Sequence, residues 1–194
     1  NYKIANAYAA QENIEDAIEQ VKGWSHKARQ EGYLALENEA LTHPDAYAAK
    51  GLGLLVDGCS DQKLRDTLEI DLLLERERLL EASRVYEAMG GYSPTIGILG
   101  AVLGLIQAMS FITDPQKLGD GVATAFIATI YGVGLANLLF LPMANKLKQR
   151  VEQKMLYHEM LAEGVIAISQ GESPVSIELK LEAYRVDRPN VVVE

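Results

Sequence analysis

The sequence has little of what disulfide-linked secreted modules and nucleic-acid-binding proteins depend on. Cysteine occurs once, at Cys59, so no intrachain disulfide can form, and the chain fits a reducing compartment. The 18 Lys and Arg residues stand against 27 Asp and Glu residues, which gives a net charge of -9. Because phosphate contacts require a surplus of Lys and Arg, this balance argues against sequence-independent binding of nucleic acid.

Motifs of catalysis and metal binding are also missing. His158-Glu159 begins like the helical motif of zinc proteases, but Ala162 stands where the second histidine would have to be. Glycine pairs such as Gly132 and Gly134 lack the third glycine of a nucleotide-binding loop. The three histidines and one cysteine are scattered along the chain. We therefore expect no enzyme activity, no cofactor and no metal site.

Charged side chains are absent from two long segments. Residues 95–113 and residues 121–145 contain no Asp, Glu, Lys, Arg or His. About 20 predominantly apolar residues in a helix suffice to cross the hydrocarbon core of a bilayer, so both segments predict membrane-spanning helices. The alternative is a helical hairpin buried in a large soluble core. It is disfavoured because the rest of the chain has too little apolar surface to enclose such a hairpin.

Basic residues lie on one side of these two segments. They precede the first segment or follow the second: Arg76, Arg78, Arg84, Lys146, Lys148, Arg150 and Lys154. The connection at residues 114–120 instead carries two Asp and one Lys. By the positive-inside rule, both ends of the hairpin are cytoplasmic and the connection faces outward.

Helical spacing of apolar residues predicts elements at both ends of the chain. Apolar positions from Ile14 to Ala40 predict an amphipathic helical stretch, which Pro44 brings to an end. A short helix is expected over residues 46–56. After the second span, we expect the helix to continue to Gly171. Ser173-Pro174 should then begin a last short helix, with Ser173 as its cap.

A long charged helix is predicted between these elements and the first span. Ser60 or Asp61 can cap it by accepting hydrogen bonds from free backbone N–H groups. Its mixed charges at helical spacing are typical of a solvated face with ion pairs between neighbouring turns. The helix is expected to run to Met89 and to end at Gly90-Gly91.

Within the two spans, the small residues are candidates for helix packing and the hydroxyl residues are candidates to line an ion path. Gly97, Gly100 and Gly104 form a stripe that we expect to pack against more helices than the two spans alone supply, in further copies of the chain or in partner helices outside it. Ion movement through a membrane normally needs a titratable group at depth, so a conducting assembly would take its carboxylate from another chain. Thr124 and Thr129 are candidates to line such a path, although a membrane Thr more commonly bonds its own helix backbone.

Three stretches resemble the MotA family of flagellar motor stator subunits, within the MotA/TolQ/ExbB superfamily. Residues 91–106 (GYSPTIGILGAVLGLI) resemble the start of the family's third membrane helix. Residues 125–134 (AFIATIYGVG) and 141–148 (LPMANKLK) resemble parts of the fourth. Residues 29–37 (RQEGYLALE) are similar to the family's cytoplasmic signature after the second membrane helix.

The resemblance implies an all-α integral membrane protein of the bacterial inner membrane. A MotB-type peptidoglycan-binding subunit would carry the ion-binding Asp, and the two would form an ion channel, proton-driven in this case. The subunit would form a homo-oligomeric, pentameric ring that converts ion-motive force into torque on the rotor's switch-complex protein. Family members have four membrane helices, so the first two are expected before Asn1.

The same comparison implies a domain organisation. Residues 1–90 form a cytoplasmic, rotor-facing helical region. Residues 91–145 form a transmembrane hairpin with a short periplasmic turn at 113–121. Residues 146–194 form a cytoplasmic helical extension and a C-terminal tail, which leaves both termini of the chain in the cytoplasm.

Residue roles follow from the matching motifs. Arg29 and Glu37 match the charged pair that contacts the rotor, and their separation suggests two turns of one helix face. Pro94 and Pro142 match prolines at the cytoplasmic ends of the spans, where a perturbed helix can serve as a hinge for torque.

The ion pathway is assigned in the same way. Thr129 matches a position near the partner's Asp, with Thr124 as a further hydroxyl. Ala101 stands where sodium-driven relatives carry Thr, which favours protons. Two other functions remain open: an energiser of the ExbB/TolQ type, whose members generally lack the 29–37 signature, and a non-conducting scaffold whose hairpin anchors a cytoplasmic helical domain.

Overall fold

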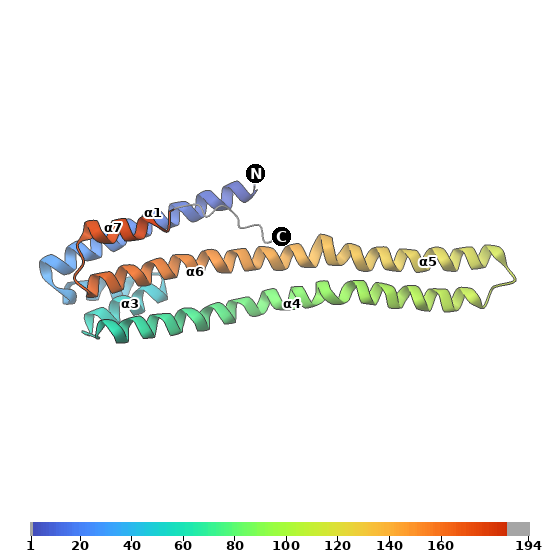
Figure 1. The fold of residues 1–194 in the computed structure, drawn as a ribbon, viewed down its shortest axis with the longest axis horizontal. Coiled ribbons are helices and arrows are strands. Elements are labelled where there is room, and N and C mark those ends of the chain that lie inside the picture. Colours follow the sequence, from blue (N-terminus) through green and yellow to red (C-terminus); the bar gives the residue numbers. More distant parts are fainter. Residues whose placement is uncertain (1, 186–194) are drawn as a thin grey trace. The chain divides into compact units, whose positions relative to one another are not determined.

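The computed structural model describes residues 2–185, with side chains from residue 14 onward, and every described element is a helix. The predicted tail beyond residue 185 lies outside the described residues. In chain order the elements are α1 (Tyr2–Glu31), η1 (Tyr33–Leu36), α2 (Glu37–Thr42), α3 (Ala46–Val56), α4 (Asp61–Met109), α5 (Pro115–Gly134), η2 (Leu135–Phe140), α6 (Leu141–Ser169) and α7 (Pro174–Glu182) (Figure 1). The prediction of an all-α fold is confirmed.

Internal contacts divide the chain into two compact units. The terminal unit holds Asn1–Arg76 and Glu152–Glu194, and the hairpin unit holds Glu77–Val151. The domain boundaries predicted at residues 90 and 146 refer to the position of a membrane, and they stay a prediction.

In the terminal unit, one face of α1 packs against α6. Ile18 and Val21 are completely buried, as are Met160 and Leu161. Gly164 permits the close approach, since a Cβ atom there would lie 2.6 Å from Cγ1 of Val21. The amphipathic face predicted from residue 14 onward is confirmed.

The helix boundaries predicted in the terminal unit are largely confirmed as well. α3 covers Ala46–Val56 as expected. The helix after the second span ends at a left-handed Gly171 (φ 73°), and the Ser173 hydroxyl accepts a bond from Ser176 N at 3.1 Å. The helical stretch predicted from Ile14 to Ala40 is interrupted at Gly32 (φ 84°), and beyond it Leu34 is 74% exposed while Leu36 is buried, so no regular apolar face continues.

Glycines bring the two long helices of the hairpin unit into backbone contact. A Cβ atom on Gly132 would lie 2.7 Å from the carbonyl oxygen of Ser93 and 2.8 Å from Cα of Gly97. A Cβ atom on Gly97 would lie 2.9 Å from the carbonyl oxygen of Ala128. The small-residue stripe of α4 is therefore occupied by α5 of the same chain, so the stripe alone does not indicate a second chain.

The remaining faces of this hairpin are uncovered. Asp61–Met109 and Pro115–Ser169 each contain a stretch long and apolar enough to cross a membrane, and only 11% and 17% of these stretches is buried. Ile96, Leu103 and Phe126 are 65%, 59% and 67% exposed. A hairpin in the core of a soluble protein would be covered on all sides, so the exposure disfavours that alternative.

The first span is part of one continuous helix, which corrects two boundaries. α4 runs through Gly90-Gly91, where the sequence predicted an end. Glycine weakens a helix by about 1 kcal/mol relative to alanine. Gly90 has a packing reason to be there, because a Cβ atom would lie 2.7 Å from Cδ2 of Leu141. The turn between the spans is also shorter than predicted: α4 ends at Met109, and α5 begins at Pro115.

The second span contains a π-helical turn that the sequence did not predict. Between α5 and α6, η2 (Leu135–Phe140) is a π-helix, and Leu141 N donates to Ala136 O, five residues back. Pro142 follows directly. A proline inside a helix has no N–H to donate and its ring crowds the carbonyl four residues earlier, so a wider turn before it relieves the clash.

Candidate functional site

The predicted contact pair lies on two different helices. Arg29 is in the last turn of α1, where a cation is favoured by the helix dipole. Gly32 then takes a left-handed conformation (φ 84°), which ends the helix, and Glu37 begins α2. The expectation that Arg29 and Glu37 share one helix face was therefore wrong, because one glycine redirects the chain between them.

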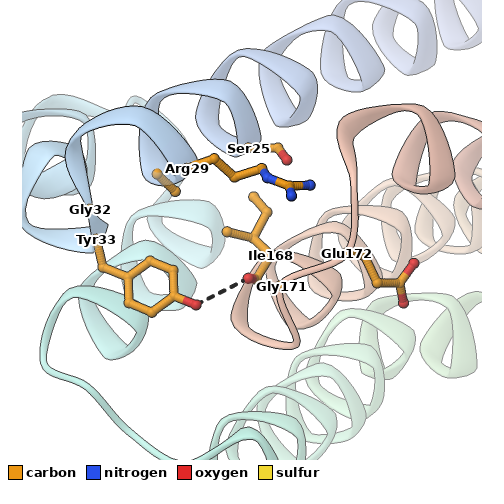
Figure 2. A pocket seen from close by; sticks show the side chains of 8 residues that line it. Ser25, Arg29, Gly32, Tyr33, Ile168, Gly171 and Glu172 are labelled. Carbon is orange, nitrogen blue, oxygen red and sulfur yellow. Dashed lines mark hydrogen bonds between the residues drawn. The ribbon is translucent and has the colours of Figure 1, made fainter.

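A pocket of about 290 Å³ lies beside Arg29 in the terminal unit (Figure 2). It is formed between the end of α1 and the connection from α6 to α7. Its lining residues are Ser25, Ala28, Arg29, Gly32, Tyr33, Ile168, Gly171 and Glu172. Figure 2 shows the Arg29 guanidinium and the Ser25 hydroxyl on the same side of α1, facing that connection.

Most polar groups of this pocket already have partners. The Tyr33 hydroxyl donates to the carbonyl oxygens of Ile168 at 3.3 Å and Ser169 at 3.2 Å. Glu172 accepts bonds from Lys180 Nζ at 2.6 Å and from the Ser176 hydroxyl at 3.0 Å. The bond from Lys180 holds the pKa of Glu172 below its ordinary value.

Two donors in the pocket are uncommitted. Arg29 is exposed and forms no ion pair within the described residues. The Ser25 side chain is only 1% exposed, and its Oγ has no hydrogen-bond partner among them. Burying a hydroxyl without a partner is unfavourable. A cation next to an unused hydroxyl suits an incoming carboxylate, which accepts hydrogen bonds at both oxygens.

Glu37 lies apart from this pocket, exposed in the first turn of α2. α2 is attached to α1 through Lys27, whose Nζ lies 2.6 Å from Oε1 of Glu39. That ion pair holds the pKa of Glu39 below its ordinary value. The structure therefore presents Glu37 and Arg29 as separate charges of opposite sign on neighbouring elements.

Both threonines predicted to line an ion path bond the backbone of their own helix. Thr124 Oγ1 donates to Asp120 O at 2.9 Å, and Thr129 Oγ1 donates to Ala125 O at 3.4 Å. This is the more common arrangement for a threonine in a membrane helix. Thr124 and Thr129 are five residues apart, which puts them on different faces of α5, and Ala101 belongs to α4.

The two predicted hinge prolines lie close in sequence to one contact between the two helices of the hairpin. Pro94 lies inside α4, and Pro142 is the second residue of α6. Gly90, four residues before Pro94, touches Leu141, which directly precedes Pro142. The prolines could be recognised in the sequence. That both flank the same contact depends on packing between residues about 50 positions apart.

Sequence reasoning missed Ser25 and Tyr33 as parts of a site. Ser25 looks like an ordinary polar residue of α1, and only the position of α6 and α7 buries it. Nothing in its local sequence signals the pocket. Among the residues that the structure describes, no group of three or more His, Cys, Asp and Glu side chains is placed to hold a metal ion.

Comparison with known proteins identifies relatives that match most of this chain. The family model described as MotA/TolQ/ExbB proton channel family matches residues 39–160. Motility protein A of Bacillus subtilis is 37% identical over 171 residues, which cover 88% of this chain and 63% of that protein. Chemotaxis protein PomA of Vibrio alginolyticus is 35% identical over 170 residues, 88% of this chain and 66% of that protein.

Solved structures agree with these relatives. A chain in the structure of C. jejuni MotAB matches with a TM-score of 0.85 at 28% identity, covering 97% of this chain and 80% of that one. A chain of the flagellar MotAB stator complex from Bacillus subtilis matches with a TM-score of 0.78 at 36% identity, covering 86% and 65%. The chain thus spans a little under two thirds of the length of Motility protein A of Bacillus subtilis.

Proposed function

Because this chain belongs to the MotA/TolQ/ExbB proton channel family, we propose that it is a stator subunit of a flagellar motor. Together with a MotB-type peptidoglycan-binding partner it forms an ion channel and converts ion-motive force into torque on the rotor. Its work is mechanical and conductive, with no catalysed reaction and no cofactor.

One observation carries this proposal. The two spans are apolar, largely uncovered and free of Asp, Glu, Lys, Arg and His over residues 95–113 and 121–145. A proton path needs a titratable group at depth, so the carboxylate has to come from a companion subunit. The similar solved structures are of MotAB and of a MotAB stator complex, which supports a partner of the MotB type.

The proposed location is the bacterial inner membrane. Residues 91–145 cross it as a hairpin whose turn faces the periplasm, while residues 1–90 and 146–194 lie in the cytoplasm. Several copies surround the partner as a ring, for which we propose five copies. Basic residues on the cytoplasmic side of both spans support this orientation.

For the rotor contact, we propose that the pocket beside Arg29 receives an acidic side chain of the switch-complex protein. Arg29 supplies the charge and Ser25 a second donor, which gains its missing hydrogen bond on contact. Glu37, exposed on α2, is available to a basic side chain of the same partner. The opposite charges of the two residues would fix the orientation of the rotor protein.

For the ion path, we propose that Thr129 and Thr124 contribute hydroxyls near the partner's carboxylate. Their present bonds to backbone carbonyls leave the oxygen lone pairs free to accept. Ala101 offers a methyl group where a sodium path would use a hydroxyl ligand, which supports protons as the coupling ion.

The proposal is tested by purification and flux together. The chain, in its full-length protein, should co-purify with a single-span, peptidoglycan-binding subunit that carries a membrane Asp. Reconstituted in vesicles, the pair should conduct protons at constant pH whether or not sodium is present. A stable assembly without any acidic companion would contradict the stator function, and flux that stops when sodium is withdrawn would contradict proton coupling.

Pro142→Leu should block rotation while leaving insertion in the membrane intact. Leucine restores an N–H that can donate to Leu138 O, so the π-turn closes into a regular helix and the hinge stiffens. Rotation of tethered cells and the amount of membrane-bound protein are measured together. Pro115→Leu is the matched control, because proline at the first position of α5 withholds no helical hydrogen bond. Normal rotation in Pro142→Leu would contradict the hinge.

A further inference from the structure

One polar side chain inside the second span has no part in the proposed function. Asn137 belongs to the π-helix η2, and its side chain is exposed on the hairpin unit. Between Thr129 and Asn145, only Tyr131 and Asn137 have a side chain with nitrogen or oxygen. A polar group inside a bilayer is costly unless it bonds another helix or lines a water-filled path. Asn137 therefore needs a partner within the membrane.

The side-chain amide of Asn137 is held in one orientation by its own helix. Nδ2 donates to the carbonyl oxygen of Val133 at 3.0 Å. Because this bond uses the N–H end of the amide, the oxygen at the other end is directed away from Val133 O. That oxygen, Oδ1, accepts no hydrogen bond from the described residues. The amide thus presents a fixed acceptor on the surface of the span.

The π-turn leaves a second acceptor on the same residue. In a regular helix the carbonyl oxygen of Asn137 would accept from Leu141 N, but this N–H donates to Ala136 O instead. In the wider register of the π-turn the donor would be residue 142, which is a proline without an N–H. No helical donor therefore remains for this carbonyl. Asn137 contributes two oxygen acceptors, one from the side chain and one from the backbone.

Asn137 lies on the side of the span that carries Thr129. Thr129, Val133 and Asn137 follow one another at four-residue steps, so they form one row along the helix. Tyr131, two residues after Thr129, lies on the opposite side of α5. Asn137 is about two turns nearer than Thr129 to the basic residues that begin at Lys146. An ion that leaves a carboxylate near Thr129 for the cytoplasm therefore passes Asn137 next.

The two acceptors suit water and a hydrated cation. Both oxygens are uncharged, so they accept hydrogen bonds from water without holding an ion permanently. Irregular backbone at membrane depth is tolerated where it lines a water-filled cavity, and π-turns are frequent at functional sites. The alternative is a donor side chain on a companion helix. A single hydroxyl from such a helix would leave one of the two acceptors of Asn137 without a bond.

We propose that the π-turn at Asn137 is a water-binding site in the cytoplasmic half of the ion path, where Asn137 Oδ1 and the Asn137 carbonyl oxygen accept hydrogen bonds from the water that carries the coupling ion. The inference rests on the proposed stator function, because it requires ions to pass beside Thr129. Asn137 acts by holding water in position, and it does not change charge itself.

The reactivity of a cysteine beside this site tests whether water is present. The probe is Val133→Cys in a Cys59→Ser background, because position 133 lies one turn from Asn137 and Cys59 is the only cysteine of the sequence. A small cationic methanethiosulfonate reacts with thiols that contact water. In membranes that hold the full-length protein and its companion subunit, Val133→Cys should react about tenfold faster than Leu138→Cys. Leu138 is the control, since it is 83% exposed and lies beside Asn137 on another face.

The same probe shows whether Asn137 holds the water. Adding Asn137→Leu should slow the reaction of Val133→Cys about tenfold, because the side-chain acceptor is removed. Equal rates at positions 133 and 138 would overturn the proposal. So would a rate at position 133 that Asn137→Leu leaves unchanged.

Ion flux tests what this water does. Reconstituted with the companion subunit in vesicles, Asn137→Leu should conduct about tenfold less than the wild type, with sodium present or absent. Asn137→Ser should stay within about threefold of the wild type, because a hydroxyl still binds water. Asn145→Leu is the matched control, since it makes the same change in α6 beyond the apolar segment, and it should conduct normally. Wild-type flux in Asn137→Leu would overturn the proposal.

Assembly with the companion subunit separates this inference from its alternative and from the stator function. Asn137→Leu should co-purify with the companion in wild-type amounts, because water and not the companion helix binds Asn137. Loss of the assembly, together with an unreactive Val133→Cys, would overturn the proposal in favour of a direct bond between helices. A wild-type pair without flux would contradict the stator function itself, whereas equal flux in wild type and Asn137→Leu would contradict only the water site.

Discussion

Gly132→Ala should force the two spans of the hairpin unit apart. The added Cβ atom would lie 2.7 Å from Ser93 O and 2.8 Å from Gly97 Cα. Both are backbone atoms of α4, so no side-chain rotation relieves the overlap, and the helices have to separate along their contact. Overpacking of this kind costs about 1–3 kcal/mol or more. In lipid the loss is severe, because close contact between small residues supplies much of the attraction between helices.

Thermal unfolding of the purified protein in detergent measures the expected loss, and swimming of a complemented strain measures its consequence. Gly134→Ala is the matched control, since a Cβ atom there meets nothing within 4 Å. It changes the same residue type two positions away on the same span. Should Gly132→Ala unfold at the temperature of Gly134→Ala, the proposed backbone contact between α4 and α5 is absent from the folded protein.

Arg29→Glu should abolish rotation, the largest functional effect expected for an exposed residue of this chain. The substitution replaces the uncommitted cation of the pocket by an anion, which would repel the acidic rotor side chain that we propose to bind there. Reversing the partner's acidic residue should restore part of the rotation. Ser25→Ala, which removes only the second donor, should weaken the contact less than Arg29→Glu does. Rotation speed under load distinguishes these degrees of loss.

Lys63→Glu is the control for this charge reversal. Lys63 is exposed in the terminal unit and forms no ion pair among the described residues, but it does not line the pocket. A strain carrying Lys63→Glu should swim normally. Full motility of Arg29→Glu would remove Arg29 from the rotor contact. Loss of rotation that no change in the rotor protein rescues would place its effect elsewhere.

Local sequence patterns were sufficient to predict the helical hairpin and most of the helix ends. Two charge-free segments, together with basic flanks, predicted spans that the structure shows as long apolar helices. The face from Ile14 to Trp24, the short helix at Ala46–Val56 and the stop at Gly171 followed from periodicity and glycine geometry. These features depend on residues within a few turns of one another.

Predictions failed where a distant contact outweighed a local preference. Gly90-Gly91 interrupts a helix by propensity, yet α4 continues through both residues, and Leu141 packs closely against Gly90. The opposite happened at Gly32, where a left-handed backbone separates Arg29 from Glu37. Glycine permits both outcomes, so sequence alone does not choose between them.

The amino-acid sequence by itself determined an all-helical chain with two apolar segments and no acid of their own, because hydrophobicity and charge are properties of each residue. Tertiary structure decided which groups meet: the unused hydroxyl of Ser25 beside Arg29, and His158 between Asp45 and Glu75. Asp45 and His158 are 113 positions apart. Only packing of α3, α4 and α6 brings these two side chains within hydrogen-bond distance, and burial there strengthens the hydrogen bond between them.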